Sequence, residues 1–539
     1  MMVRRFSPLL IVLTLAALIG AAFLFPDFRL DPREKLFAVT GEERLAAQVR
    51  GAFQWALRWT RPLPDTADHV PVANKDLHPF GVNTFLEQEV EPEKRARSLA
   101  MIADAGFSSI RQSFPWYDIE IHGKGDFEDR RHDPPRSAWE KYDHIVDLAG
   151  NYDLAIIARL EHPPAWSREA GTEKGAFAPP DDLDDFGDYV ATVVSRYRGR
   201  IRFYQIWNEP NIYPEWGHQP VDPEGYTEML CLAYERVKEA DPQAVVISGA
   251  LAPTAELGTW NPSYEGNNLM DVIFLQRMYD AGAGDCFDVM AVNNYMLFSG
   301  PTDRRLEPTP DQVNFSRPLW VRDVMVANGD AGTPIWISEM NSNAAPEGVE
   351  ARFGRMTLEQ QARYAPLALD RIRREWPWAG VTSVWFFKRA TDTERDQPFY
   401  HFRLVEPDFT PMPVFETLST YLNDLEPTLY AGRHQESSWQ LTYEGEWQER
   451  RTPHAELGAY RTTRAPGASL TVSWEGRRLR LDPGTAEGRI RIEDASGHRR
   501  EVTLTGEAVD LTATLLPRVH RWTLTAVEGE FAVDALEVH

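Results

Sequence analysis

Between residues 77 and 428 the chain repeats one pattern eight times: a short apolar run is followed by a longer stretch with helical periodicity. Such alternation predicts βα units, whose strands pair in parallel. Eight units in a segment of this length predict an α/β fold, a (β/α)8 TIM barrel with insertions in the loops after its strands. We expect its strands near residues 79–84, 108–113, 154–160, 202–208, 244–250, 287–295, 333–339 and 381–388.

Two of these runs end in a single glutamate. Glu209 follows the run 201–206 in Trp207-Asn208-Glu209-Pro210, and Glu339 ends the run 334–338. Burial at a strand end disfavours the charged form of a carboxyl and raises its pKa, which suits a proton donor. The strands of such a barrel open on one face, so we expect both carboxyls there, as cleavage of a glycosidic bond by two carboxylates requires.

These motifs resemble a known group of enzymes. Asn208-Glu209-Pro210 after the fourth strand and Glu339 after the seventh follow the pattern of the clan of retaining glycoside hydrolases built on (β/α)8 barrels. Within the clan the chain resembles family 39, in particular bacterial members that cleave biofilm exopolysaccharide. The resemblance covers roughly residues 78–425 and includes the segments 80–83, 222–226 and 409–415.

The resemblance assigns roles to the two glutamates and their neighbours. Glu209 would be the general acid and base, and Glu339 the nucleophile. Arg111 lies inside an apolar run, matches the strand-two arginine of the clan, and would favour the ionised nucleophile. Asn208 would hydrogen-bond the 2-hydroxyl of the sugar, an interaction that strengthens in the transition state.

Further substrate-binding residues are expected at other strand ends. The resemblance implies that Tyr295 directs its hydroxyl at the nucleophile and that Trp385 forms the floor of the cleaved subsite. The clan usually has a histidine where this chain has Asn293, and we expect Asn293 to bind substrate in its place. His162 and Trp166 follow the third strand and are expected either to line a subsite or to pack structurally. Further candidates in the loops are Trp116, Glu87 and Trp216.

The composition argues against several classes of partner and cofactor. The net charge of −24 and pI of about 5 argue against nucleic acid or an anionic polysaccharide attracted by the overall field, although a local cationic cleft is compatible with them. Two cysteines, Cys231 and Cys286, make no disulfide framework and leave no metal cluster. The sequence has no Gly-rich phosphate loop and no His-x-x-x-His zinc pattern, so we expect no cofactor and no metal.

Residues 1–26 predict a membrane segment. Arg4 and Arg5 precede Leu9–Phe25, which is 17 residues of uncharged apolar sequence and is either an anchor or a signal peptide. Residues 26–29 show no Ala-x-Ala-like cleavage site, which favours the uncleaved anchor. The basic flank then predicts a single-pass protein of the cell membrane with its body outside the cytoplasm. Cleavage would make the protein secreted.

The barrel is flanked by two further predicted regions. Residues 27–76 are expected to form a juxtamembrane stalk and linker, in which Glu42–Thr60 is helical and packs on the barrel through its apolar face, namely Leu45, Val49, Phe53 and Leu57. Residues 429–539 alternate apolar and polar residues between turns, which predicts a β-sandwich. This region resembles the galactose-binding-type sandwich that is often appended to glycosidases. It would bind sugar or shield one side of the barrel.

Three functions fit these observations. The first is a retaining glycoside hydrolase that cleaves O-glycosidic bonds of a polysaccharide or oligosaccharide by double displacement. The second is a transglycosylase, which uses the same carboxylates but passes the sugar to an acceptor other than water. The third is a catalytically silent sugar-binding or scaffold protein at the cell surface. Intact Glu209 and Glu339 argue against the third, because degraded enzymes commonly lose one carboxylate.

Overall fold

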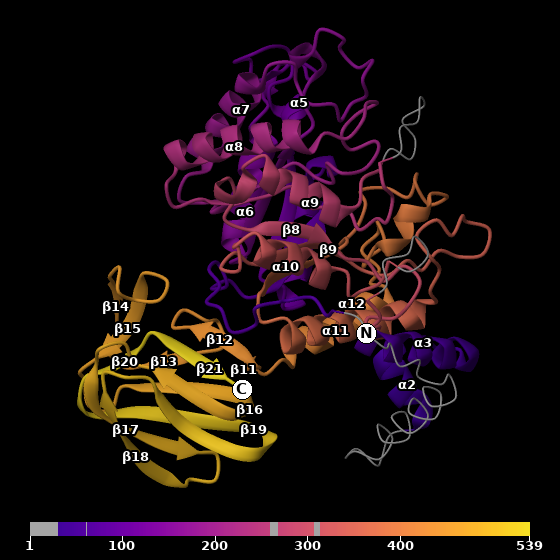
Figure 1. Cartoon of the computed structure of the whole chain (residues 1–539). Helices are drawn as coiled ribbons and strands as arrows, with labels where there is room; N and C mark the ends of the chain where they lie inside the picture. Colours follow the sequence, from indigo (N-terminus) through magenta and orange to yellow (C-terminus); the bar gives the residue numbers. More distant parts are fainter. Residues whose placement is uncertain (1–30, 61, 259–267, 307–312) are drawn as a thin grey trace, which may run out of the picture.

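The computed structural model describes residues 31–60, 62–258, 268–306 and 313–539 of the chain, which form a barrel with a β domain below it (Figure 1). Eight parallel strands follow the order β7-β6-β5-β2-β1-β10-β9-β8, and bridges from Ile247 to Val289 and from Leu251 to Val292 close the ring. The predicted (β/α)8 barrel is therefore confirmed. Its strands are β1 (Phe80–Thr84), β2 (Ser109–Pro115), β5 (Ala155–Glu161), β6 (Phe203–Ile206), β7 (Val245–Ile247), β8 (Met290–Asn293), β9 (Ile335–Met340) and β10 (Ala379–Val384).

One helix follows each strand and covers the outside of the barrel. Several begin with signals that the sequence carries: a proline opens α4, α8, α10 and α12, and Thr357 and Gln360 form a capping box on α11. The loop after β2 carries the predicted insertion, with α5 (Trp116–Ile119), β3 (Glu128–Asp129) and β4 (Arg136–Ser137). The eight helices are α4 (Pro92–Asp104), α6 (Glu140–Asn151), α7 (Leu183–Tyr197), α8 (Pro223–Ala240), α9 (Asp271–Asp280), α10 (Pro318–Ala327), α11 (Leu358–Glu375) and α12 (Pro413–Asn423).

The barrel interior has an apolar floor. Ile157, Phe203 and Trp336 are buried together there. Gly380 lacks a side chain where one is forbidden, because a Cβ would lie 2.1 Å from the indole nitrogen of Trp336. Side chains two residues apart on a strand share a face, so the residues that follow these on β5, β6 and β9 rise from the floor toward the carboxyl ends of the strands.

The two cysteines form a disulfide. Cys231 on α8 is bonded to Cys286, which follows the short helix η4 (Ala283–Asp285), at a sequence separation of 55. Two cysteines alone did not predict a disulfide framework from the sequence. In the structure their bond links α8 to the segment that leads into β8. Cross-linking two distant residues stabilises a protein mainly by restricting its unfolded chain.

We expect the double variant Cys231→Ser/Cys286→Ser to lose about 2–4 kcal/mol of unfolding free energy in denaturant titrations. The oxidised wild-type chain treated with sodium dodecyl sulfate should show no titratable thiol before reduction and two after it. An equal stability of the reduced and oxidised chains would contradict this role. The single variants serve as controls, because each removes the bond and leaves one free thiol.

The C-terminal region is an antiparallel β domain. Its larger sheet has the order β12-β21-β16-β19-β17-β18 with β11 and β13 paired to β16, and its smaller sheet has the order β14-β15-β20. Trp474 and Trp522 belong to its core. The strands are β11 (Thr428–Leu429), β12 (Gly432–Gln435), β13 (Thr442–Glu444), β14 (Gln448–Arg451), β15 (Ala459–Thr463), β16 (Ser469–Asp482), β17 (Glu487–Asp494), β18 (Arg499–Thr505), β19 (Val509–Gly529), β20 (Phe531–Val533) and β21 (Ala535–Val538).

The β domain contacts the amino ends of the barrel strands. The ring of Trp439 lies 4.6 Å from that of His78, two residues before β1, and Arg374 at the end of α11 pairs with Glu475 at 2.6 Å. The opposite end of the barrel, where the strand-end glutamates lie, is therefore left uncovered by this domain.

The N-terminal region forms a helical hairpin of α2 (Pro32–Thr40) and α3 (Leu45–Leu57), followed by η1 (Arg58–Thr60). The predicted helix is present, but the prediction of its buried face is wrong for Leu45, Val49 and Phe53, which are exposed. Leu57 is half-buried, and the buried residues are Gln48, Gly51 and Ala52. Small residues allow close packing, since a Cβ on Gly51 would lie 3.0 Å from Thr40. Leu9–Phe25 lies outside the described residues, and no described helix is long and apolar enough to cross a bilayer.

Candidate active site

Glu339 lies in β9 at the carboxyl end of the barrel and is buried. Arg111 of β2 donates from Nη1 to its Oε1 at 2.8 Å, and the hydroxyl of Tyr295 donates to its Oε2. The Nη1 of Arg159 on β5 lies 3.8 Å from the same Oε1. Two cations and a hydroxyl donor thus surround one carboxylate. The position predicted for Arg111 and the contact predicted for Tyr295 are both present.

Arg111 connects Glu339 to the rest of the site. Its guanidinium also donates to Asn83 Oδ1 and Asn208 Oδ1, both at 2.8 Å, and to Gln205 Oε1 at 2.6 Å. Asn208 therefore has its acceptor engaged, and its Nδ2 has no hydrogen-bond partner among the residues that the structure describes, so it remains available to a ligand. The sequence did not predict Asn83 and Gln205 as site residues, because no sequence pattern indicates that an amide inside a strand binds a distant arginine.

Glu209 follows β6 on a constrained turn. Its φ is +44° and that of Trp207 is +74°, and its backbone N–H donates to Ala250 at 2.9 Å. The indole of Trp207 donates to the carbonyl of Glu215 at 2.8 Å and fixes the turn from the other side. Burial and then the charge of Glu339 raise the pKa of Glu209 to about 7. Glu209 therefore keeps its proton up to a pH of about 7, as a general acid requires.

A single short segment at the carboxyl end of β8 contacts both carboxyls. Asn293 donates from Nδ2 to Glu209 Oε1 at 2.7 Å, and Tyr295, two residues further on, donates to Glu339. The hydrogen bond from Asn293 opposes the rise in the pKa of Glu209, because it favours the carboxylate. Burial and Glu339 raise the pKa of Tyr295 well above its usual value, so its hydroxyl keeps its proton and remains a donor.

Arg159 and Glu161 on β5 form a second charged pair at the site, which the sequence analysis missed. Arg159 Nε lies 2.5 Å from Glu161 Oε1, and Ser113 donates to the same oxygen at 2.9 Å. Arg159 lowers the pKa of Glu161 against the opposing effect of burial. The signal was present in the sequence, since a charged residue inside an apolar run is the pattern that identified Arg111.

Two further carboxyls lie within electrostatic reach of these groups. Glu87, a loop candidate, accepts a hydrogen bond from Gln112 at 2.5 Å, and burial raises its pKa. Burial, followed by the charge of Glu209, raises the pKa of Glu215 well above its usual value. Glu215 was missed because it lies in an irregular loop six residues after the acid, where no periodicity marks it.

The aromatic candidates divide into two groups. Trp385 follows β10, is half-buried, and meets the ring of Phe85 at 5.5 Å, which leaves part of its surface open. Trp166 instead packs edge-on against buried Trp116 and donates to the carbonyl of Glu120 at 2.8 Å. His162 stands beside Glu161 at 3.6 Å, and burial lowers its pKa. Trp116 and Trp216 are fully enclosed, so they pack in the core and line no subsite.

The side chains at the barrel mouth do not suit a metal ion. Glu339 and Glu161 are each paired with an arginine, and a cation would have to displace these guanidinium groups. Among the described residues, one group brings three ligating side chains within 4.8 Å of one another, and it consists of His69, Glu537 and His539. It lies at the contact between the linker and the β domain and belongs to no part of this site.

The chain is similar in structure to family 39 glycoside hydrolases. The enzyme of this family from Bacteroides cellulosilyticus WH2 is 17% identical, with a TM-score of 0.48, and the match covers 85% of this chain and 83% of the other. A monomeric beta-xylosidase from Caulobacter crescentus CB15 is 15% identical, with a TM-score of 0.46 and coverage of 88% and 98%. The GH39 enzyme of Xanthomonas axonopodis pv. citri is 14% identical, with a TM-score of 0.45 and coverage of 88% and 97%. No family model matches the sequence.

We expect Arg111→Met to lose about 3–5 kcal/mol of unfolding free energy, because it leaves buried acceptors and a buried carboxylate without their partner. In the Glu339→Gln background the same substitution should cost less by about 0.5–3 kcal/mol. Denaturant titrations of the four chains measure this coupling. An equal cost in both backgrounds would show that the ion pair does not control the packing of the site.

Proposed function

We propose that the protein is a retaining glycoside hydrolase that cleaves O-glycosidic bonds by double displacement. The observation that carries the proposal is that the two carboxyls have different surroundings. The pKa of Glu209 is raised to about 7, whereas Glu339 forms an ion pair with Arg111 and accepts a hydrogen bond from the hydroxyl of Tyr295. A proton donor and an anionic nucleophile on one barrel mouth are what the two steps need. The presence of both carboxyls argues against a silent sugar-binding protein.

The first step forms the glycosyl-enzyme. A carboxylate oxygen of Glu339 attacks the anomeric carbon while Glu209 gives its proton to the departing glycosidic oxygen. In the second step Glu209, now a carboxylate, takes a proton from water as the water oxygen attacks the anomeric carbon and releases Glu339. The free Nδ2 of Asn208 would donate to the sugar 2-hydroxyl, and Trp385 would stack on the sugar ring in the cleaved subsite.

The substrate would be a polysaccharide or oligosaccharide outside the cytoplasm. The membrane location rests on the apolar run Leu9–Phe25 behind Arg4 and Arg5. The disulfide between Cys231 and Cys286 supports an oxidising compartment. The β domain is proposed to be a galactose-binding-type sandwich. Its contacts with the amino end of the barrel place it away from the site, which favours a structural role over sugar binding at the mouth.

Hydrolysis should retain the anomeric configuration. Proton NMR of the first product formed from an activated aryl glycoside, recorded before mutarotation, decides this. An inverted product would overturn the double displacement.

The two glutamates should differ when each is replaced. Glu339→Ala should lose the first step, and azide should restore turnover with an inverted azide product. Glu209→Ala should still form the glycosyl-enzyme from substrates with good leaving groups and then turn over slowly. Glu93→Ala, at an exposed position on α4, is the matched control and should behave as wild type. Identical behaviour of the two site variants on activated substrates would refute the assigned roles.

The activity should fall as the pH rises through about 7, because Glu209 must hold its proton to act as the acid. Asn293→Ala removes a hydrogen bond that favours the carboxylate, so the pKa of Glu209 should rise and the alkaline limb of kcat/KM should move to higher pH. The pH profiles of both chains on one substrate test this. If the alkaline limb of kcat/KM stayed in place or moved to lower pH, the hydrogen bond from Asn293 would not be lowering the pKa of Glu209.

A further inference from the structure

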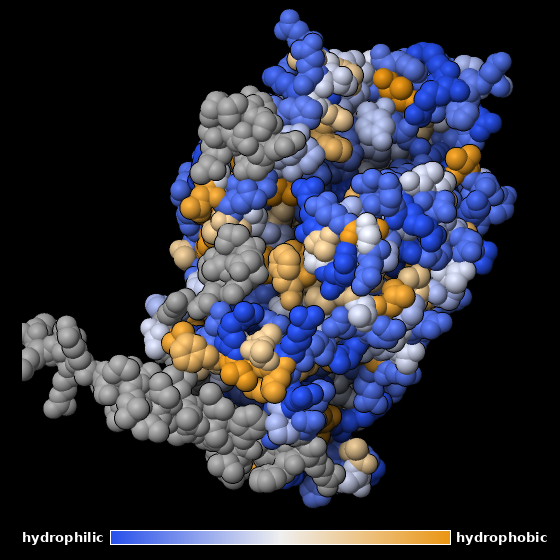
Figure 2. All heavy atoms as spheres, turned by 90° about the vertical axis from the view of Figure 1, so that its right-hand side faces the viewer, coloured by the Kyte–Doolittle hydropathy of each residue, from blue (hydrophilic) through white to orange (hydrophobic). Residues whose placement is uncertain are grey.

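Helix α3 presents a stripe of large apolar side chains to solvent. Leu45, Val49 and Phe53 are 51%, 60% and 50% exposed, and their spacing of four residues places them on one face of the helix. Figure 2 shows hydrophobic residues gathered in the lower part of the face on which the hairpin lies. Scattered apolar residues on a surface need no explanation, but a row of three on one helix indicates a contact surface. We call these three residues the apolar stripe.

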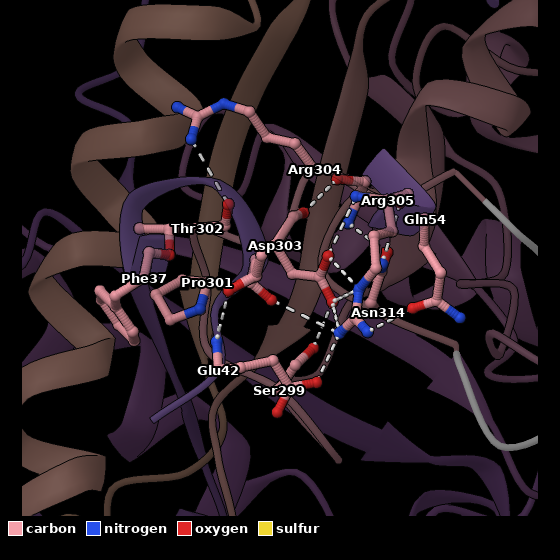
Figure 3. Close-up of polar contacts among 12 residues, drawn as sticks. Phe37, Glu42, Gln54, Ser299, Pro301, Thr302, Asp303, Arg304, Arg305 and Asn314 are labelled. Atoms are coloured by element: carbon pink, nitrogen blue, oxygen red, sulfur yellow. Dashed lines mark hydrogen bonds and ion pairs between the residues drawn. The ribbon is translucent and has the colours of Figure 1, made fainter. Parts of the chain in front are cut away.

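The barrel holds the hairpin in place, so the direction of the apolar stripe is fixed. The loop after β8 carries most of these contacts: Gly300 donates to the carbonyl of Gly41 at 2.8 Å, and Arg305 pairs with Glu42 at 2.8 Å and donates to Gln54 at 3.1 Å. Figure 3 shows Glu42 and Gln54 of the hairpin on either side of Arg305. The hairpin is therefore attached through its inner face, and the apolar stripe points away from that attachment.

A second attachment joins the hairpin to α11. The ring of Phe37 lies 5.9 Å from that of Tyr364, and Arg363 stands over Phe37 at 4.6 Å. Tyr364 also donates to Glu43 at 2.7 Å, and Arg363 pairs with the same carboxylate. With two separate attachments, the hairpin cannot rotate to bury its apolar stripe against the barrel.

Two arginines lie next to the apolar stripe in the sequence of the hairpin. Arg44 and Arg50 are exposed beside it, and neither forms an ion pair with any residue of the described part of the chain. Glu42 and Glu43, which connect α2 to α3, are each paired with an arginine of the barrel. An apolar row flanked by free guanidinium groups suits the interface of a bilayer, where apolar side chains reach the acyl region and cations meet lipid phosphates.

The position of the hairpin in the chain identifies the same partner. The apolar run ends at Phe25 and α2 begins at Pro32, so the seven steps between them span at most about 25 Å. If the run lies in a membrane, the hairpin must stay near that surface. We infer that the apolar stripe of α3 docks on the lipid bilayer entered by residues 9–25. This inference rests on the membrane location proposed above, and it is independent of the chemistry at Glu209 and Glu339.

Docking would also orient the active site. The loop that holds the hairpin is the continuation of the segment that contacts both carboxyls, from Asn293 through Tyr295 to Arg305. A bilayer contact at α3 thus fixes the barrel through the same loop that organises the site. A tether alone would leave the barrel free to tumble, whereas the docked hairpin sets one orientation toward the membrane.

The test uses the full chain reconstituted in nanodiscs of phosphatidylcholine and phosphatidylglycerol. A nitrobenzoxadiazole label on Val49→Cys reports on the apolar stripe, and the same label on Val519→Cys, 65% exposed on the β domain, is the matched control. The native cysteines are bonded to each other and do not react with the label. Lipids with a doxyl group near the headgroup should quench the label at position 49 at least twofold more than the label at position 519. Equal quenching would overturn the inference.

A second variant separates docking from anchoring. Leu45→Glu/Val49→Glu/Phe53→Glu, labelled at Ala46→Cys, should remain in the nanodisc through residues 9–25 but lose the excess lipid quenching seen for the same label without the three substitutions. Cross-linking between copies and a doubled mass, without lipid quenching, would show a second copy on the stripe and overturn the inference. Release of the chain with a new N-terminus after residue 20 would overturn it together with the membrane location, and would leave the glycosidase proposal untouched.

Discussion

The buried guanidinium of Arg111 is the interaction on which the site depends. It rises from β2 and binds acceptors from three other parts of the barrel: Asn83 on β1, Gln205 and Asn208 at β6, and Glu339 on β9. Burial and the charge of Arg159 lower the pKa of Arg111, which shows how unfavourable a cation is at this position without partners. Four acceptors offset that cost. Because they come from different strands, the same contacts set the position of the nucleophile candidate relative to the turn that carries Glu209.

The polar layer around Arg111 can exist because the layer beneath it is apolar and closely packed. On β5 the inward face runs from Ile157 through Arg159 to Glu161, and on β6 it runs from Phe203 to Gln205. On these two strands, the two-residue periodicity of side chains places apolar residues at the floor and polar or charged residues at the mouth.

This arrangement explains which parts of the structure were predictable. Glu209, Glu339 and Arg111 each break an apolar run, and that break is a local signal in the sequence. The contact between Asn293 and Glu209 crosses the barrel mouth and leaves no local trace. The buried face of α3 was predicted wrongly because apolar periodicity locates large side chains, whereas this helix buries the small residues Gly51 and Ala52 and packs Gly51 against Thr40 of α2. The disulfide was also beyond prediction, since a pairing over 55 residues depends on the final positions of α8 and η4.

The unequal carboxyls also account for how Glu209 would serve in both steps of the proposed reaction. Burial is the larger cause of its raised pKa, and the charge of Glu339 is the next. When Glu339 becomes esterified to the sugar, that charge disappears while the burial and the hydrogen bond from Asn293 remain. The pKa of Glu209 must then fall, so the group that gave a proton in the first step is a carboxylate when water arrives. Asn293 suits this cycle because its amide is a neutral donor that does not titrate, so its hydrogen bond to Glu209 is available in both steps.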